Sequence, residues 1–586
     1  MCGIVGYVGS SKASLVILEA LKNVEYRGYD SAGIAVMGSK INIIKDVGKL
    51  EEIEKKHDFS RLEGTIGIGH TRWATHGGVN AMNAHPHTDE RGEVCLVHNG
   101  IIENFLELKD ELLKSGCKIK SETDTELVAH LIARGLREGK GFKDAFLSAI
   151  RRIEGSFSFV VMHQGERKLY GARRSSPLVV GVGKNEMFFA SDVPAFLSRT
   201  RDFVFLAEDE WAEITDSTYA IYGFDGTRIK RKPVHIEWTP QMAQKDGYPH
   251  FMLKEIVEQQ NTIRAAIAAD IRAAGEILTK NEIRQLFLVA CGTSYHAALI
   301  FKGLLARHGI GCEAIIGSEY VADFFGKKDV VIAISQSGET ADMLLAVREA
   351  KRKGAKIIGI TNVVGSSLSR EADACVYIGA GPEVSVVATK SFTSQLVVLY
   401  RLAWLLIKNE DCAEQLKDLS AVLGAILTKE GEIKKLAKML SKMRDFFFIG
   451  RGLSYPIALE GALKLKEITY LHAEGYPAGE LKHGPMSLLD KGVCVIAIAP
   501  EDDTTQKILS NIQECRARNA TVVGFSDSSR ILSSCDVFFR MPTLEKPLFS
   551  PIIYAVPLQM LSYYMAVLLG RDPDKPRNLA KSVTVE

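Results

Sequence analysis

Short apolar runs separated by glycine and polar residues dominate the first 240 or so positions of the chain. Runs of this length predict β-strands, which we expect at 3–9, 34–37, 65–70, 94–98, 157–163 and 203–207. Apolar positions at helical spacing predict helices only at 105–115 and 125–138. Many strands with few helices predict an α+β domain built from antiparallel sheets.

A different pattern begins at Ile283, where short apolar runs alternate with helical stretches. Such alternation predicts a parallel sheet wrapped by helices, with strands at 286–290, 330–334, 356–360 and 375–378. The pattern then recurs. Residues 287–295 (FLVACGTSY) resemble 447–455 (FFIGRGLSY), and 358–361 (IGIT) resemble 523–526 (VGFS). We therefore expect two copies of one α/β subdomain.

Domain boundaries follow from these patterns and from Pro233, Pro240 and Gly247, which indicate a linker. The predicted parts are a first domain at 2–240, a linker with a leading helix at 241–282, α/β subdomains at 283–425 and 435–570, and a C-terminal tail at 571–586.

Composition narrows the class of protein. The 586 residues, 46% hydrophobic and 25% charged, suit a soluble protein of several domains. A net charge of +2 gives no reason to expect nucleic acid or membrane as a partner. Ten scattered cysteines without zinc spacing predict reduced thiols, a cytoplasmic location and no metal. No signal peptide fits the N-terminus, and the longest apolar runs, such as 493–500, are too short to span a bilayer.

Cys2, directly behind Met1, has catalytic potential. Removal of Met1 would leave a thiol and a free α-amine on one residue. An α-amine with a reference pKa of about 7.7–8.0 can take the thiol proton. The alternative is a buried structural cysteine, as most lone cysteines are, and position alone favours that interpretation.

Asn99 and Gly100 carry groups that suit amide cleavage. A side-chain amide and a backbone N–H are the donor types that hold a tetrahedral oxyanion, but Asn-Gly is also the commonest hairpin turn. In the segment 70–77 (HTRWATHG), Arg72 suits bidentate capture of a carboxylate, and an ordinary exposed loop is the alternative.

Asp124 stands immediately before a predicted helix. Its carboxylate could bind a substrate ammonium group. It could equally stabilise the helix N-terminus, because Thr123 and Glu126 fit a capping box. Local sequence does not separate these two interpretations.

Two hydroxyl-rich segments, 291–294 (CGTS) and 335–340 (SQSGET), follow predicted strands of the first α/β subdomain. Small hydroxyl residues at a helix N-terminus offer donors to a phosphate, and ligands of parallel sheets sit at the carboxyl ends of strands. Helix capping selects the same residues. Two such segments in one subdomain favour a phosphate site, whereas the glycine-rich nucleotide motifs do not occur.

Glu460, Lys464 and Glu467 fall on one face of the helix after Pro456. Such a stripe is either a salt-bridged solvent face or an acid/base site in a cleft. His483, in the loop 479–485, is another potential proton carrier. Lys581 lies in a tail that would ordinarily be frayed.

Taken together, the chain strongly resembles the glutamine–fructose-6-phosphate aminotransferase (isomerising) family over essentially its whole length. The specific motifs are 1–6 (MCGIVG), 26–33 (YRGYDSAG), 72–76 (RWATH), 98–100 (HNG), 335–340 and the tail 579–586. The resemblance implies an α+β N-terminal-nucleophile glutaminase domain, a sandwich of antiparallel sheets, followed by two α/β sugar-isomerase subdomains.

The resemblance also implies roles for the residues above. Cys2 would attack the amide of glutamine, and Asn99 and Gly100 would hold the oxyanion. Glutamine would be bound by Arg72, Thr75, His76 and Asp124, and Trp73 would gate the released ammonia. Fructose 6-phosphate would be bound by Thr293, Ser294, Ser335, Gln336, Ser337 and Thr340. Lys581 would form a Schiff base, His483 would assist ring opening, and Glu467 would move a proton between C1 and C2 beside Lys464.

The family needs no metal or organic cofactor and is commonly a homodimer or higher homo-oligomer. This chain departs from it at Ala388, where the family commonly has Ser, so a hydroxyl contact to the sugar is absent. Another ketose phosphate as substrate, or a sugar-phosphate-binding regulatory protein, remains open. An amidophosphoribosyltransferase would need a run of acidic residues after a strand, and none occurs.

Overall fold

The computed structural model describes residues 2–74 and 76–584. Contacts divide the chain into two compact units. The first holds the chain up to Gln244 and the last residues from Ala580 on, and the second runs from Lys245 to Leu579.

The first unit contains two antiparallel sheets. The eight strands of the first sheet lie in the order β15 (Val234–His235), β11 (Asp202–Phe205), β9 (Val179–Val182), β10 (Met187–Ala190), β1 (Gly3–Val8), β4 (Ile66–Arg72), β2 (Ser31–Met37) and β3 (Ile41–Val47). The seven strands of the second lie in the order β14 (Arg228–Ile229), β13 (Tyr219–Gly223), β12 (Glu210–Ile214), β8 (Leu169–Arg174), β7 (Gly155–His163), β6 (Val94–Ile102) and β5 (His87–Thr88).

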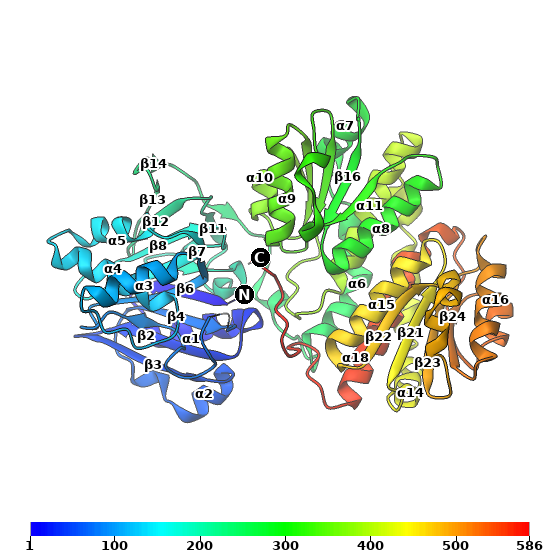
Figure 1. Ribbon diagram of the computed structural model, residues 1–586, viewed down its shortest axis with the longest axis horizontal. Helices are drawn as coiled ribbons and strands as arrows, with labels where there is room; N and C mark the ends of the chain where they lie inside the picture. The colour runs from blue at the N-terminus through cyan, green and yellow to red at the C-terminus, as the bar shows by residue number, and fades with distance from the viewer. Residues whose placement is uncertain (1, 75, 585–586) are drawn as a thin grey trace. The chain divides into compact units, whose positions relative to one another are not determined.

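These sheets form the middle of a four-layer sandwich (Figure 1). Apolar side chains of β1, β4, β6 and β7 pack between the sheets. Helix α1 (Ala13–Val24) covers the outer face of the first sheet, and α4 (Thr125–Arg137) and α5 (Phe142–Ile150) cover that of the second. The antiparallel α+β expectation is confirmed. The expectation of only two helices is wrong, because α1 and α5 are also helices, each of which buries an apolar stripe.

The second unit contains two five-stranded parallel sheets with the same strand order. One has the order β17 (Glu313–Ile316), β16 (Leu286–Ala290), β18 (Val330–Ile334), β19 (Lys356–Thr361) and β20 (Ala374–Tyr377). The other has the order β22 (His472–Pro477), β21 (Asp445–Gly450), β23 (Val493–Ile498), β24 (Thr521–Ser526) and β25 (Val537–Arg540). The shared order confirms the predicted repeat.

One apolar core joins the two sheets of the second unit. It is built largely from α6 (Phe251–Ile267), α8 (Gly292–Ala306), α11 (Lys390–Lys408), α15 (Ser454–Thr469) and α18 (Ser550–Leu568). Among the described residues, one helical stretch, Pro547–Leu568, is long and apolar enough to cross a membrane, contrary to the expectation that the apolar runs are too short. Because 89% of its most apolar window is buried inside the protein, it has the burial of a core helix.

Candidate active sites

Cys2 stands at the start of β1, in the middle of the first sheet. Its sulfur accepts a hydrogen bond from the Trp73 backbone N–H at 3.2 Å and lies 3.5 Å from the Trp73 carbonyl oxygen. Burial raises the pKa of the Cys2 thiol above its ordinary value, although the Trp73 N–H and the Arg72 guanidinium oppose this effect. The thiol therefore remains protonated until a base removes its proton.

The backbone carbonyl of Cys2 is fixed by two side chains. Asn99 Nδ2 donates to it at 2.8 Å, and Arg27 Nε donates at 3.4 Å. Arg27 is itself paired with Asp192 at 2.6 Å, and Tyr26 donates to the same carboxylate. The motif 26–33 thus positions the residue that carries the thiol.

Asn99 and Gly100 lie inside β6 and form no turn. The strand continues to Ile102 and pairs with β7 over its whole length, so the hairpin-turn interpretation is wrong. Gly100 has φ +121°, and a Cβ atom there would lie 1.9 Å from the Ser156 carbonyl oxygen. Only glycine is compatible with this backbone, which sets the direction of the peptide next to Asn99.

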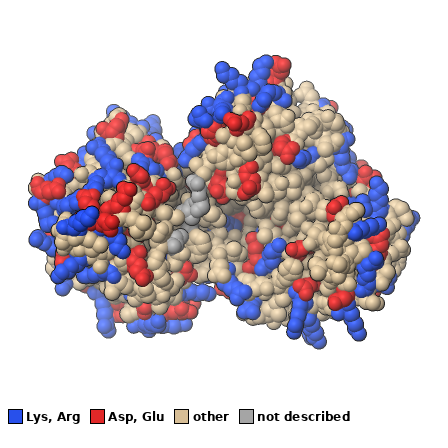
Figure 2. All heavy atoms as spheres, viewed as in Figure 1, with Lys and Arg blue, Asp and Glu red and all other residues tan. Residues whose placement is uncertain are grey.

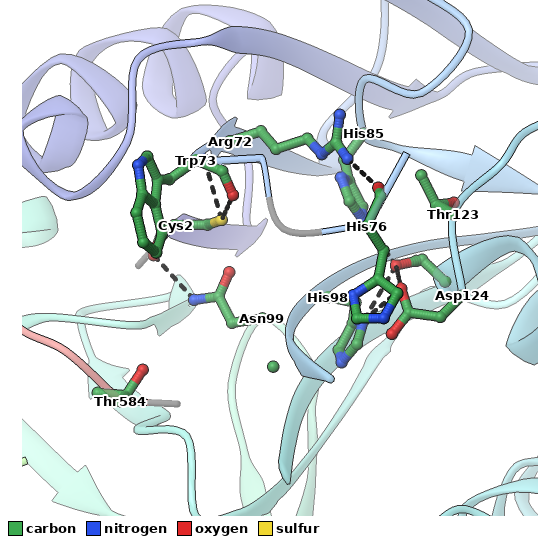
Figure 3. A pocket seen from close by; sticks show the side chains of 12 residues that line it. Cys2, Arg72, Trp73, His76, His85, His98, Asn99, Thr123, Asp124 and Thr584 are labelled. Carbon is green, nitrogen blue, oxygen red and sulfur yellow. Dashed lines mark hydrogen bonds and ion pairs between the residues drawn. The ribbon is translucent and has the colours of Figure 1, made fainter. Parts of the chain in front are cut away.

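A pocket of about 520 Å³, including its open mouth, joins these groups (Figure 3). Its lining contains Cys2, Arg72, Trp73, His76, His85, His98, Asn99, Gly100, Thr123, Asp124, Thr125 and Thr584. Seven of the residues predicted for the glutamine site therefore line one pocket. Thr584, from the C-terminal tail, lines it as well. Thr75 lies outside the described residues.

Asp124 faces this pocket and does not cap its helix (Figure 3). Its Oδ2 accepts the Ile102 N–H at 2.9 Å. The Glu126 carboxylate accepts N–H groups of Lys120 and Ser121, so the predicted capping box does not form. The geometry favours the ligand-binding interpretation of Asp124.

Thr125 connects Asp124 to two buried histidines, a connection that the sequence did not suggest. Its hydroxyl lies 3.4 Å from Asp124 Oδ1 and 2.9 Å from both His98 Nδ1 and His85 Nε2. Burial lowers the pKa of both imidazoles below their ordinary value. Thr125 thus links the Asp124 carboxylate to two neutral imidazoles.

Arg72 is almost fully buried, and its guanidinium donates to carbonyl oxygens of the loop after it. Nη1 donates to Gly78 at 3.3 Å, and Nη2 donates to Gly77 at 3.2 Å and to His76. The His76 ring packs edge-on against Phe105. Arg72 therefore holds the 76–78 loop in this structure, and a substrate carboxylate would take over some of these donors.

In the second unit, the predicted sugar-phosphate segments follow β16 and β18. These neighbouring strands are the switch point of a sheet with order 2-1-3-4-5, where ligands of such sheets bind. The Ser335 and Thr340 hydroxyls lie 2.9 Å apart, and Ser335 accepts the Gly338 N–H. Thr340 precedes α9 (Ala341–Arg352) without capping it by its side chain, and Gln336 and Ser337 are half-buried beside it.

Thr293 and Ser294, at the start of α8, have different surroundings. The Thr293 hydroxyl accepts from Lys464 Nζ at 3.0 Å and lies 3.2 Å from Glu460 Oε1. Ser294 is buried and exchanges hydrogen bonds with Gln395 of α11. Thr293 therefore faces the charged stripe of α15, whereas the Ser294 side chain faces the core.

The charged stripe of α15 is buried, so the solvent-face interpretation is wrong for Glu460 and Lys464. Lys464 Nζ lies 3.3 Å from Glu460 and 2.8 Å from Glu467, and His296 Nδ1 lies 2.7 Å from Glu460. Burial alone would lower the pKa of Lys464, but the two carboxylates outweigh it and raise that pKa. Burial would raise the pKa of Glu460, but Lys464 and His296 hold it below its usual range. Lys464 is thus an ammonium rather than a base.

Two predicted sugar-site residues stand apart from this network. His483 is exposed at the end of a short helix, 478–483, and no hydrogen bond or ion pair joins it to Glu467 among the described residues. Lys581 is half-buried in the tail segment that belongs to the first unit. Ala388 is half-buried before Thr389, whose buried hydroxyl has no partner in the described part of the chain.

Sequence reasoning missed His296, Thr125 and the buried histidines of the first unit. Helical spacing could have indicated His296, one turn from Gly292 on α8, but its partner Glu460 is remote in the chain. Among the described residues, no group of three or more His, Cys, Asp or Glu side chains is arranged to hold a metal ion.

Comparison with known proteins agrees with this division. A family model described as a SIS domain matches residues 280–405 and 439–569, and one described as a glutamine amidotransferase domain matches 70–198. Glutamine–fructose-6-phosphate aminotransferase [isomerizing] of Thermococcus kodakarensis is 49% identical, and that of Aquifex aeolicus is 45% identical, each over the full length of both chains. The chain belongs to the glutamine–fructose-6-phosphate aminotransferase (isomerizing) family.

Membership of this aminotransferase family confirms the resemblance seen in the sequence motifs. A solved structure supports the fold of the second unit. The C-terminal domain of glucosamine-fructose-6-phosphate aminotransferase from Francisella tularensis matches with a TM-score of 0.53 and 37% identity, covering 56% of this chain and 99% of that one. The two parallel sheets are thus the two SIS subdomains of an aminotransferase.

Proposed function

We propose that this protein takes ammonia from glutamine at Cys2 and uses it to convert fructose 6-phosphate to glucosamine 6-phosphate. The observation that carries the proposal is the placement of Cys2 beside Asn99, Gly100, Arg72 and Asp124 in one pocket. Membership of the aminotransferase family over the full chain supports both halves of the reaction.

In the glutamine half, the α-amine of Cys2, freed by loss of Met1, takes the proton of the raised-pKa thiol. The thiolate attacks the side-chain carbonyl carbon of glutamine, and Asn99 Nδ2 and the Gly100 N–H hold the oxyanion. Collapse of this intermediate expels ammonia and leaves a thioester, which water hydrolyses to glutamate. The α-amine passes the proton it took from the thiol to the departing nitrogen, which leaves as ammonia.

Recognition of glutamine uses the charged ends of its backbone. Asp124 binds the ammonium group, and Arg72 binds the carboxylate after part of its contact to the 76–78 loop is exchanged. We assign Thr75 and His76 to the wall of the site, and Trp73, which contacts the sulfur through its backbone, to the gate for ammonia.

In the sugar half, the phosphate is bound by Ser335, Gln336, Ser337 and Thr340, with Thr293 and Ser294 at the neighbouring helix start. Lys581 condenses with the C2 carbonyl, releasing water, after His483 assists ring opening. Ammonia from the glutamine half then adds to this imine and displaces the Lys581 amine, so that C2 carries the new nitrogen. Glu467 moves a proton between C1 and C2. The ammonium of Lys464 orients Glu467, at 2.8 Å, and supplies positive charge near the developing enolamine.

The remaining proposals concern organisation. We assign 2–240 to glutamine hydrolysis, 241–282 to the linker and leading helix, 283–425 and 435–570 to the sugar site, and 571–586 to the tail that joins the two activities. We propose a homodimer or larger homo-oligomer. The free state of all ten cysteines supports a reducing, cytoplasmic setting.

The test is incubation with glutamine and fructose 6-phosphate, with glutamate and hexosamine phosphate measured together. We expect equal amounts of both products. Glutamate without amino sugar would overturn the synthase assignment. Because Ala388 removes a hydroxyl, the same assay with other ketose phosphates tests whether fructose 6-phosphate is preferred.

A further inference from the structure

His70, on β4, lies directly behind the amide of Asn99 on β6, in the layer between the two sheets. Its Nε2 is 3.0 Å from Asn99 Oδ1 and 3.0 Å from the His98 carbonyl oxygen. We propose that His70 is a positioning residue that fixes the amide orientation of Asn99 and so prepares the oxyanion site. This inference rests on the proposed role of Asn99.

The orientation of the Asn99 amide follows from its neighbours. The Cys2 carbonyl oxygen, 2.8 Å from one end of the amide, can only accept, so that end must be the NH₂ group. The other end, which faces His70 Nε2, is therefore the oxygen. The second partner of Nε2, the His98 carbonyl, is also an acceptor. Nε2 must carry the proton, which defines the tautomer of His70.

The charge state of His70 is equally constrained. The ring is fully buried, its centroid is 4.2 Å from that of His85, and its Nδ1 has no hydrogen-bond partner among the described residues. A proton on Nδ1 would be a buried, unpaired donor. Burial lowers the pKa of His70 to about 3, which agrees with a neutral ring.

A neutral N–H behind Asn99 has two effects on the reaction. It opposes flipping of the amide, because a flipped amide would face the His70 N–H with its NH₂ group and the Cys2 carbonyl with its own oxygen. Donation to Oδ1 also polarises the amide and strengthens its N–H groups as donors. One of them holds Cys2, and the second can receive the oxyanion of the intermediate.

The test is a double-mutant cycle on glutamine hydrolysis with the full-length protein lacking Met1. His70→Phe, Asn99→Ala and the double variant are compared, and His163→Phe, a half-buried imidazole elsewhere in the unit, is the control. We expect His70→Phe to lower kcat about 10²-fold with little change in KM, as loss of an oxyanion donor does. The double variant should be no slower than Asn99→Ala alone. His70→Gln, which retains an N–H donor, should recover part of kcat.

A binding measurement separates positioning from structural damage. Glutamate semialdehyde forms a tetrahedral adduct with Cys2, whereas glutamate does not. His70→Phe should weaken the aldehyde at least about ten-fold and leave glutamate affinity unchanged. Parallel loss of both ligands, or losses that multiply in the double variant, would overturn the proposal. Unchanged kcat in Asn99→Ala would instead overturn the oxyanion role of Asn99, and the role of His70 with it.

Discussion

The two sites of this chain carry charge in opposite ways. Apart from Arg72 and Asp124, the pocket around Cys2 is lined by neutral groups, among them a thiol, the Asn99 amide and the buried imidazoles of His85 and His98, whose pKa values burial lowers. The site on α15 is a buried ion network in which Lys464 lies between Glu460 and Glu467. On the face shown in Figure 2, by contrast, acidic and basic side chains are mixed over both units.

The contrast follows from the chemistry proposed for each site. Amide cleavage develops one negative charge at a known place, and fixed neutral dipoles stabilise it without being neutralised beforehand. Moving a proton between two carbons needs groups that exchange charge, and buried charges persist only when they are paired. We therefore expect substitutions in the two sites to have different effects: loss of glutamine hydrolysis at the Cys2 pocket and loss of stability at the α15 network.

The largest expected effect is at the neutral site. Cys2→Ala should lower glutamate release by about 10³-fold or more, since the nucleophile is lost. Hydrogen exchange at C1 of fructose 6-phosphate in deuterated water, measured by NMR, should stay within about three-fold of the wild type, because proton transfer depends on other groups. Cys117→Ala, a thiol outside the pocket, is the control. Retained glutamate release would remove Cys2 from the mechanism.

Removing one charge from the α15 network should instead lower the free energy of unfolding. Lys464→Met leaves Glu460 and Glu467 without their shared cation and should destabilise the protein by about 3–5 kcal/mol. Exchange at C1 should be lost while glutamate release persists. Urea unfolding measures the first effect, and Lys466→Met, an exposed lysine on the same helix, is the matched control. Equal stability of the two variants would show that the ion network is not what holds this region.

An intermediate effect is expected on the transfer of ammonia from glutamine hydrolysis to amino-sugar formation. Trp73→Ala should leave glutamine hydrolysis measurable, because the hydrogen bond to Cys2 comes from the backbone of residue 73. Ammonia should escape, so glutamate should exceed glucosamine 6-phosphate when both are assayed together. Trp238→Ala removes a half-buried indole elsewhere in the unit and should keep the products equal. Equal loss of both products in Trp73→Ala would reject the gate.

How much the sequence revealed differs between the two sites for a physical reason. The strands ending at Ala290 and Ile334 were predicted with their observed bounds, because buried parallel strands are continuous apolar runs. The segments that we propose to bind phosphate follow directly from those strand ends. The residue types of Asn99 and Gly100 were enough to suggest an oxyanion site. Their place inside a strand could not be predicted, because Asn-Gly suits a turn equally well.

The sequence could not predict contacts between elements that are distant in the chain. The roles of His70, Thr125 and His296 depend on how β4, α4 and α8 pack against other elements, and no local pattern records that packing. For Asp124, sequence left two interpretations, and the structure excludes the helix cap because the Asp124 carboxylate accepts from Ile102 and caps no helix N–H.

The smallest expected effect tests a charged residue that supports the Cys2 pocket from outside its lining. Glu126 holds Lys120 and Ser121, just before Asp124. Burial alone would raise its pKa, but hydrogen bonds from His130 and from these backbone N–H groups lower it to about 2. Because the folded value lies below the unfolded one, this stabilisation is present above pH 4.5 and is lost as the pH falls toward about 2.

Between about pH 6 and about pH 3, the free energy of unfolding measured in urea should therefore fall by about 2 kcal/mol more in the wild type than in Glu126→Gln. Glu138→Gln, an exposed carboxylate at the end of the same helix, should keep the wild-type acid response. KM for glutamine should rise in Glu126→Gln, because the segment that places Asp124 loses its anchor. Identical acid responses in all three proteins would mean that the charge of Glu126 does not stabilise the site. The residues that support the Cys2 pocket would then be as independent of charge as the neutral groups that line it.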